Sequence, residues 1–156
     1  MTLKIKPIDE AQTDAFAAIW IPWLRDKMQR EPEPEDLEVM ADPGRYYRAS
    51  GGEAFLASLN GTVVGVVAVK GLGPAGYEFC KLVVSEAARG HGAGRALVQT
   101  CLEFADRCGG PALYLQSFNA LDIALNLYRK MGFVDAAPPD EMTVLGRTEV
   151  IMAKQV

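Results

Sequence analysis

Residues 83–97 read VVSEAARGHGAGRAL, and this stretch decides more about the fold than any other. An apolar strand runs into a glycine-rich turn, and the turn opens a helix. The three alternating glycines are Gly90, Gly92 and Gly94. Glycines let backbone N–H groups approach an anion without interference from Cβ, and a helix N-terminus adds partial positive charge. With Arg89 and Arg95 beside it, the stretch predicts a phosphate or pyrophosphate cradle; the alternative is a tight turn without a ligand.

Two familiar phosphate-binding loops do not fit this spacing. The loop of nucleoside-triphosphate enzymes requires Gly-Lys-Ser/Thr, whereas Gly94 is followed by Arg95-Ala96. The dinucleotide fingerprint requires Gly-x-Gly-x-x-Gly and opens a fold, whereas this loop lies past the middle of the chain. The pattern therefore argues against both of these nucleotide sites.

The hydrophobic pattern on either side of the loop predicts a mixed α/β sheet in one domain, residues 1–156. The expected strands are residues 3–8, 54–59, 62–70, 77–84, 112–118, 133–135 and 144–153. The expected helices are residues 9–20, 23–30, 37–41, the one after the glycine loop, and 123–131. We expect Pro22 to interrupt the first helical region and Asp42-Pro43-Gly44 to stop the third. Asn60-Gly61 predicts a hairpin turn, because both residues accept positive φ.

The bulk composition excludes several classes of protein. The chain has 156 residues, a net charge of −4 and no basic run, which argues against nucleic-acid binding. No apolar run approaches the roughly 20 residues of a membrane span, and the N-terminus does not resemble a signal peptide. Cys80, Cys101 and Cys108 lie in apolar sequence and predict reduced core cysteines of a cytoplasmic protein. One histidine and no paired cysteines predict that no metal is bound.

Two motifs carry a resemblance to a known family. Arg89-x-x-Gly92-x-Gly94 resembles the acetyl-CoA loop of the GNAT N-acetyltransferase superfamily, and residues 127–133, LYRKMGF, resemble its Leu-Tyr-x-x-x-Gly-Phe signature. The resemblance covers residues 54–135 clearly. It implies a GNAT-like acyl-CoA N-acyltransferase fold, with a central, mostly antiparallel sheet, a splayed parallel pair and flanking helices. It also implies acetyl-CoA as cosubstrate, held where strands 77–84 and 112–118 splay apart.

The resemblance implies a set of cofactor-binding residues. Backbone groups of Leu82, Val83 and Val84 would hold the pantetheine arm, with the Leu82 amide aimed at the thioester oxygen. The pyrophosphate would lie on the loop Arg89, Gly90, His91, Gly92, Ala93, Gly94 and Arg95. Asn119 stands nine residues before Tyr128, whereas many members have an asparagine seven before it. Asn126, on the same helix, is the alternative contact.

Two side chains match catalytic positions of the family. Tyr128 corresponds to the tyrosine that donates a proton to the departing thiolate. Glu78 corresponds to a catalytic glutamate of histone-acetylating members, and on an alternating strand it shares a face with Cys80 and Leu82. It would take the proton that an alkylammonium, with a pKa near 10, must lose before attack. The alternative is a relay of waters.

These residues lead us to expect an N-acetyltransferase that transfers an acetyl group from acetyl-CoA to a primary amine of a small molecule by direct attack. The alternatives are a protein lysine or N-terminal acetyltransferase and a non-catalytic acyl-CoA sensor, and a homodimer is compatible with each. We expect a cationic acceptor. The residues that suggest it are the acidic run 31–36 and the aromatic side chains Trp20, Trp23, Tyr46 and Tyr47.

Overall fold

The computed structural model describes residues 2–156, so Met1 lies outside the described part of the chain. Within it, strands form one mixed sheet in the order β1-β2-β3-β4-β5-β7-β6. The strands are β1 (Leu3–Pro7), β2 (Glu53–Leu59), β3 (Thr62–Gly71), β4 (Tyr77–Val84), β5 (Ala112–Ser117), β6 (Val134–Asp135) and β7 (Val150–Gln155). Neighbouring strands are antiparallel except β4 and β5, which are parallel. The predicted mixed sheet is confirmed.

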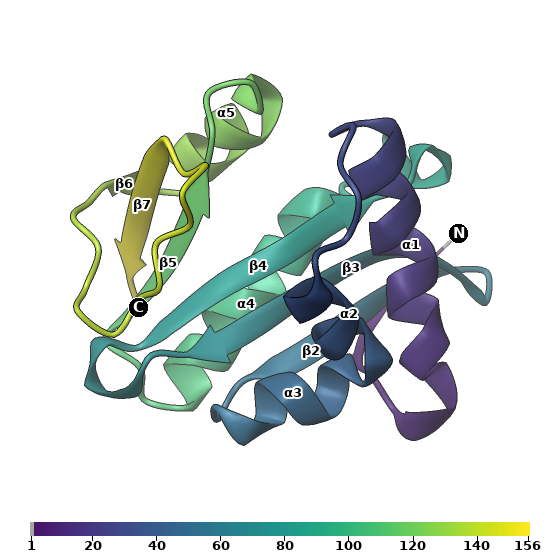
Figure 1. Ribbon diagram of the computed structural model, residues 1–156, viewed down its shortest axis with the longest axis horizontal. Coiled ribbons are helices and arrows are strands. Elements are labelled where there is room, and N and C mark those ends of the chain that lie inside the picture. The colour runs from purple at the N-terminus through teal and green to yellow at the C-terminus, as the bar shows by residue number, and fades with distance from the viewer. Residues whose placement is uncertain (1) are drawn as a thin grey trace.

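Helices cover both faces of this sheet (Figure 1). On one face lie α1 (Thr13–Asp26), α2 (Pro34–Ala41) and α3 (Pro43–Ala49). On the other face α4 (Ala93–Arg107) contacts β3 and β4, and α5 (Asp122–Lys130) adds Leu125 and Tyr128 to the same core. No helix within residues 2–156 is long and apolar enough to cross a membrane.

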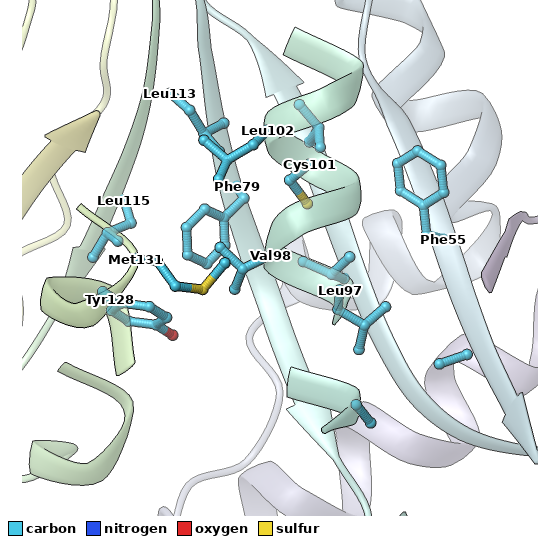
Figure 2. Close-up of a cluster of buried hydrophobic side chains, with 14 of the residues drawn as sticks. Phe55, Phe79, Leu97, Val98, Cys101, Leu102, Leu113, Leu115, Tyr128 and Met131 are labelled. Carbon is cyan, nitrogen blue, oxygen red and sulfur yellow. The ribbon is translucent and has the colours of Figure 1, made fainter. Parts of the chain in front are cut away.

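Burial on both faces explains why β3 is apolar along its length. Val67 and Val69 point into the core under α4, while Val66 and Ala68 point into the core under α1. Figure 2 shows the α4 side of this packing, where Phe79 of β4 lies among α4 side chains and Tyr128 and Met131. The apolar residues whose pattern predicted strand 77–84, such as Phe79 and Val83, therefore pack in the core.

The first helix differs from the expectation, because Pro22 does not interrupt it. α1 continues through Pro22 to Asp26. Phe16, Trp20 and Leu24 follow one another at intervals of four residues and are only 0%, 3% and 5% exposed. Burying each such side chain contributes about 1.5–3 kcal/mol, which together exceeds the roughly 3 kcal/mol cost of an internal proline.

Prolines begin two helices around the short helix that we expected at residues 37–41. α2 starts at Pro34 inside the acidic run, and α3 starts at Pro43, where we expected a stop. Proline suits a first helical position, because its missing N–H would have no partner there. The Asp42 carboxylate accepts a hydrogen bond from Arg45 N at 3.2 Å and caps α3.

Two further expectations need correction. β7 begins at Val150 and not at residue 144, because Thr143, Leu145 and Thr148 form hydrogen bonds with the Gln116 side chain and lie in a loop. Cys108 is exposed, since α4 ends before it, whereas Cys101 is buried in the core; all three cysteines are free thiols.

The parallel strands β4 and β5 pair at one end and then separate. In the described residues their register consists of Tyr77 opposite Leu113 and Glu78 opposite Tyr114. Gly76, with a φ of 116°, brings the chain close enough for this pairing, since a Cβ there would lie 2.3 Å from Ala112 O. The expected splayed pair is therefore present.

We expect Gly76→Ala to destabilise the fold by about 3 kcal/mol or more, since it adds backbone strain and a steric clash. Gly73→Ala is the matched control, because its φ is also positive, at 58°, but a Cβ there meets nothing within 4 Å. It should cost about 1–2 kcal/mol. Urea unfolding measures both, and equal losses would contradict the proposed close approach at Ala112.

Candidate active site

A cleft of about 150 Å³ opens where β4 and β5 separate. Its walls come from the C-terminal half of α1, from β4 and β5, from α5 and from the loop before β7. Glu78, Leu82 and Tyr128 all line it. The structure thus brings together in one cleft the three residues that the sequence suggested for catalysis. Two of them were suggested for their side chains and Leu82 for its backbone amide.

β4 carries a bulge at the centre of this cleft. Its register with β3 shifts between Val66, opposite Val83, and Ala68, opposite Cys80, so β4 has one extra residue. Lys81, with a φ of 61°, occupies the bulge. The expectation that Leu82 shares a face with Glu78 and Cys80 is therefore wrong: Leu82 packs toward α4, and Cys80 packs toward α1.

Glu78 is a buried carboxylate with a defined partner. It is 6% exposed, and Gln116 Nε2 donates a hydrogen bond to its Oε2 at 3.0 Å. Burial raises the pKa of Glu78, while that hydrogen bond and the charges of Lys70 and Lys81 act in the opposite direction. A carboxylate with a raised pKa is a stronger base than an exposed one, which suits proton transfer near neutral pH.

The Gln116 side chain connects Glu78 to the loop before β7. Its Nε2 also donates to Thr143 O at 2.9 Å. Its Oε1 accepts from Leu145 N at 3.0 Å and from Thr148 Oγ1 at 2.6 Å. These bonds, with the one to Glu78, use both donors and both lone pairs of the amide. Gln116 therefore fixes the carboxylate and the loop relative to each other, and sequence reasoning missed it.

Tyr128 is held by aromatic packing. Its ring makes edge-to-face contacts with Phe79, 5.4 Å between centroids, and with Phe133, at 6.1 Å. The side chain is 6% exposed. Burial raises the pKa of its phenol, so the hydroxyl stays protonated at neutral pH and can act as a donor.

The glycine loop forms a second hollow next to the cleft. β4 leads through a 3-10 turn (Glu86–Ala88) into α4, whose N-cap Gly92 is left-handed with a φ of 69°. The hollow is lined by Val84, Ala88, Arg89, Gly90, Gly92, Ala93, Gly94, Arg95, Ile123, Asn126, Leu127 and Lys130. It combines a helix N-terminus with three basic side chains, which is a chemical fit for a pyrophosphate. The sequence did not predict Lys130 as a lining residue, because its place in α5 does not show that it lies next to the glycine loop.

Two of the suggested cofactor-binding side chains do not line this hollow. His91 is exposed and does not line this hollow. Asn119 is exposed and lines neither the hollow nor the cleft, and its backbone N donates to Glu149 Oε1 at 3.0 Å. The Val83 side chain is buried in the α1 core, which leaves its predicted backbone contact with the pantetheine arm a prediction. Asn126, the alternative to Asn119, does line the hollow.

Of the four aromatic side chains expected to contact a cationic acceptor, Trp20 and Tyr47 already have partners within the protein, whereas Trp23 lines the cleft and Tyr46 is exposed. The chain's own Lys81 ammonium lies 4.5 Å from the Trp20 ring centroid and 3.5 Å from Asp36 Oδ1. Glu31 pairs with Arg25 at 3.0 Å. Tyr47 is buried and contacts the Cys80 thiol, whose pKa burial raises to about 11. At Trp20, therefore, the chain's own Lys81 ammonium takes the position that we expected for a cationic ligand.

Comparisons with known proteins agree with this geometry. Residues 14–133 match the model of the acetyltransferase (GNAT) family. The chain is 33% identical over 111 residues to Probable N-acetyltransferase family 8 member 5 of Mus musculus, which covers 68% of the chain. It is 39% identical over 80 residues, 49% of the chain, to N-alpha-acetyltransferase RimI of Mycobacterium tuberculosis. Each match covers 49% of the relative, so about half of each relative's length has a counterpart here.

Among solved structures, the fold is similar to that of a Bacillus subtilis acetyltransferase in complex with CoA. The TM-score is 0.72 at 20% identity, and the alignment covers 99% of both chains. At this identity the likeness concerns the fold.

The raised pKa of Glu78 predicts a specific dependence of stability on pH. The ordinary pKa of a glutamate carboxyl is 4.5, and as pH rises above this value the unfolded chain loses the Glu78 proton before the folded chain does. The free energy of unfolding therefore falls as pH rises from about 4.5 toward the pKa of Glu78 in the folded protein. Glu78→Gln keeps an acceptor for Gln116 and removes the titration. We expect its free energy of unfolding, relative to wild type, to increase with pH above about 4.5 and then level off.

Urea unfolding at several pH values measures this difference. Glu141→Gln, which removes an exposed carboxylate outside the cleft, controls for the loss of one negative charge. A difference between Glu78→Gln and wild type that stays constant with pH would show that Glu78 has no raised pKa.

Proposed function

The chain belongs to the GNAT acetyltransferase family, and from this premise we propose that it transfers the acetyl group of acetyl-CoA to the primary amine of a small molecule. The observation that carries the proposal is the meeting of Glu78, Leu82 and Tyr128 in one cleft. The three reduced cysteines suit an enzyme that works in the cytoplasm.

The residues between the two hollows fit acetyl-CoA as cosubstrate. Leu82 lines the cleft and Val84 lines the glycine-loop hollow, so two residues of β4, spanning about 7 Å, connect the two. A pantetheine arm lying along this strand would be bound by backbone groups. Arg89, Arg95 and Lys130 would neutralise the pyrophosphate.

In the proposed reaction the amine nitrogen attacks the thioester carbonyl carbon, and the bond from that carbon to sulfur breaks. Glu78 takes the proton that the amine loses. The Leu82 amide stabilises negative charge on the carbonyl oxygen. Tyr128 donates its proton to the departing thiolate, and the phenol then recovers a proton from solvent.

The shape of the cleft favours a small acceptor. Residues 145–148 form part of the wall on one side, and the C-terminal part of α1 with Met28 and Arg30 forms part of the wall on the other. A protein N-terminus is the second candidate, because one relative is named an N-alpha-acetyltransferase.

We expect Gly94→Ala to raise the Kd for acetyl-CoA about tenfold or more. The added methyl would lie 3.7 Å from Leu127 Cδ2 and 3.9 Å from Val84 Cγ2, so it fits the fold but occupies the hollow that both residues line. Alanine also stabilises a helix relative to glycine by about 1 kcal/mol, so lost affinity would not reflect unfolding. Calorimetry measures Kd, with Gly146→Ala as the control; an unchanged Kd would remove the glycine loop from the binding site.

We expect Tyr128→Phe to lower kcat about 10²- to 10⁴-fold, the usual effect of losing a general acid. The Kd for acetyl-CoA should stay within about twofold, because phenylalanine keeps the edge-to-face contacts that hold the ring. Steady-state kinetics that follow the free CoA thiol, together with calorimetry, separate the two effects. A wild-type kcat in the variant would exclude Tyr128 as the proton donor.

A further inference from the structure

Two arginines stand at the acceptor end of the cleft. Arg30 follows α1, and Arg147 lies in the loop before β7. Both line the cleft, and both also line a small polar hollow next to it, with Leu24 shared between the two. Arg30 and Arg147 therefore lie where the two spaces meet, although they come from opposite ends of the chain.

Neither guanidinium is neutralised by the protein. Across residues 2–156, neither Arg30 nor Arg147 forms an ion pair with a carboxylate. The adjoining hollow also contains Glu31, Glu33 and Asp36. Glu31 is paired with Arg25 and Asp36 with Lys81, which leaves Glu33 to offset two arginines. The boundary between the two spaces thus keeps net positive charge.

The position of Arg147 is coupled to the catalytic carboxylate. Thr148 and Leu145, on either side of it in sequence, donate hydrogen bonds to Gln116, and Gln116 donates to Glu78. The cleft lining thus includes the buried carboxyl of Glu78 and the two arginines, which also border the adjoining hollow. Apolar side chains, among them Trp23, Met28 and Leu121, line the same cleft.

We propose that the acceptor amine carries its own carboxylate, which Arg30 and Arg147 bind while the amino group reaches Glu78 and the acetyl carbonyl carbon. The proposal rests on the acetyl transfer proposed above and specifies its substrate class: a small amino acid with an apolar body. An arginine fork binds a carboxylate through two parallel hydrogen bonds, and two nearby cations also lower the pKa of the amine that must lose a proton. The expected acceptor therefore carries a carboxylate, whereas the sequence suggested a cationic amine.

Matched acceptors test the carboxylate directly. Leucine, leucinamide and isoamylamine share one apolar body, but only leucine has the carboxylate; phenylalanine, phenylalaninamide and phenethylamine form a second series. Values of kcat/KM are compared per unprotonated amine, since the amine pKa differs between the compounds. We expect the carboxylate to raise kcat/KM about tenfold to a hundredfold, mainly through KM, as for hydrogen bonds between charged groups.

Variants test the two arginines. In Arg30→Gln/Arg147→Gln the preference for the carboxylate should fall to nearly one, while turnover of isoamylamine stays within about twofold of wild type. Arg129→Gln is the matched control, because Arg129 is exposed and lines neither space. A preference that persists in the double variant, or an equal rate with leucine and isoamylamine in wild type, would overturn the proposal.

A binding measurement separates this proposal from the proposed reaction. Calorimetry with leucine and with isoamylamine on CoA-saturated protein needs no turnover. Tighter binding of leucine that depends on both arginines supports the carboxylate site, even if no acetylation is seen and the proposed reaction fails. Acetylation of isoamylamine without such binding would overturn the site and keep the reaction. Peptides with an acidic second residue that outperform both free amino acids would overturn the small-molecule assignment.

Discussion

β4 and β5 pair at two positions in the described part of the sheet and then separate, and most of the functional geometry depends on that separation. Parallel neighbours that diverge leave backbone N–H and C=O groups facing a gap, and buried groups of this kind need partners. On the β5 side the Gln116 side chain and the loop at residues 143–148 fill part of the gap. On the β4 side the bulge at Lys81 changes which face the following residues meet. The remaining space is the cleft in which Glu78 and Tyr128 lie.

Two charged residues of the cleft, Lys81 and Glu78, have partners of different kinds. Lys81 neutralises Asp36 and lies over Trp20, so the cation in the bulge stabilises the packing of α1 and α2 on the sheet. Glu78 lies within the core and has a neutral donor, Gln116, as its hydrogen-bond partner. A carboxylate that receives a neutral hydrogen bond keeps more of its basicity than one in a direct ion pair. Within residues 2–156, the Glu78 carboxylate therefore lies close to β5 without a salt bridge that would lower its pKa.

The two hollows, which Leu82 and Val84 of β4 line respectively, differ in construction for a physical reason. The glycine-loop hollow is made mainly from one turn, with backbone groups at the start of α4, and α5 adds side chains such as Lys130. The cleft is made from segments that are distant in sequence, and packing and hydrogen bonds between elements hold them. A phosphate needs several N–H groups in one small region, which a single turn provides. The proposed acceptor, with an amine and a carboxylate, would need groups of opposite charge from separate elements, which one turn does not provide.

The sequence by itself determined the elements whose pattern is local. β4 spans residues Tyr77–Val84 as predicted, the α4 stripe from Leu97 to Ala105 is buried, and Asn60 and Gly61 form the hairpin with φ values of 51° and 80°. Tertiary structure alone decided the passage of α1 through Pro22, the bulge at Lys81 and the convergence of Arg30 and Arg147. Spacing along a chain reports which face of a helix or strand is apolar. It does not report which distant part of the chain that face packs against. At Pro22, at Lys81 and at the two arginines, contacts between distant parts of the chain set the structure, and the local sequence pattern did not predict it.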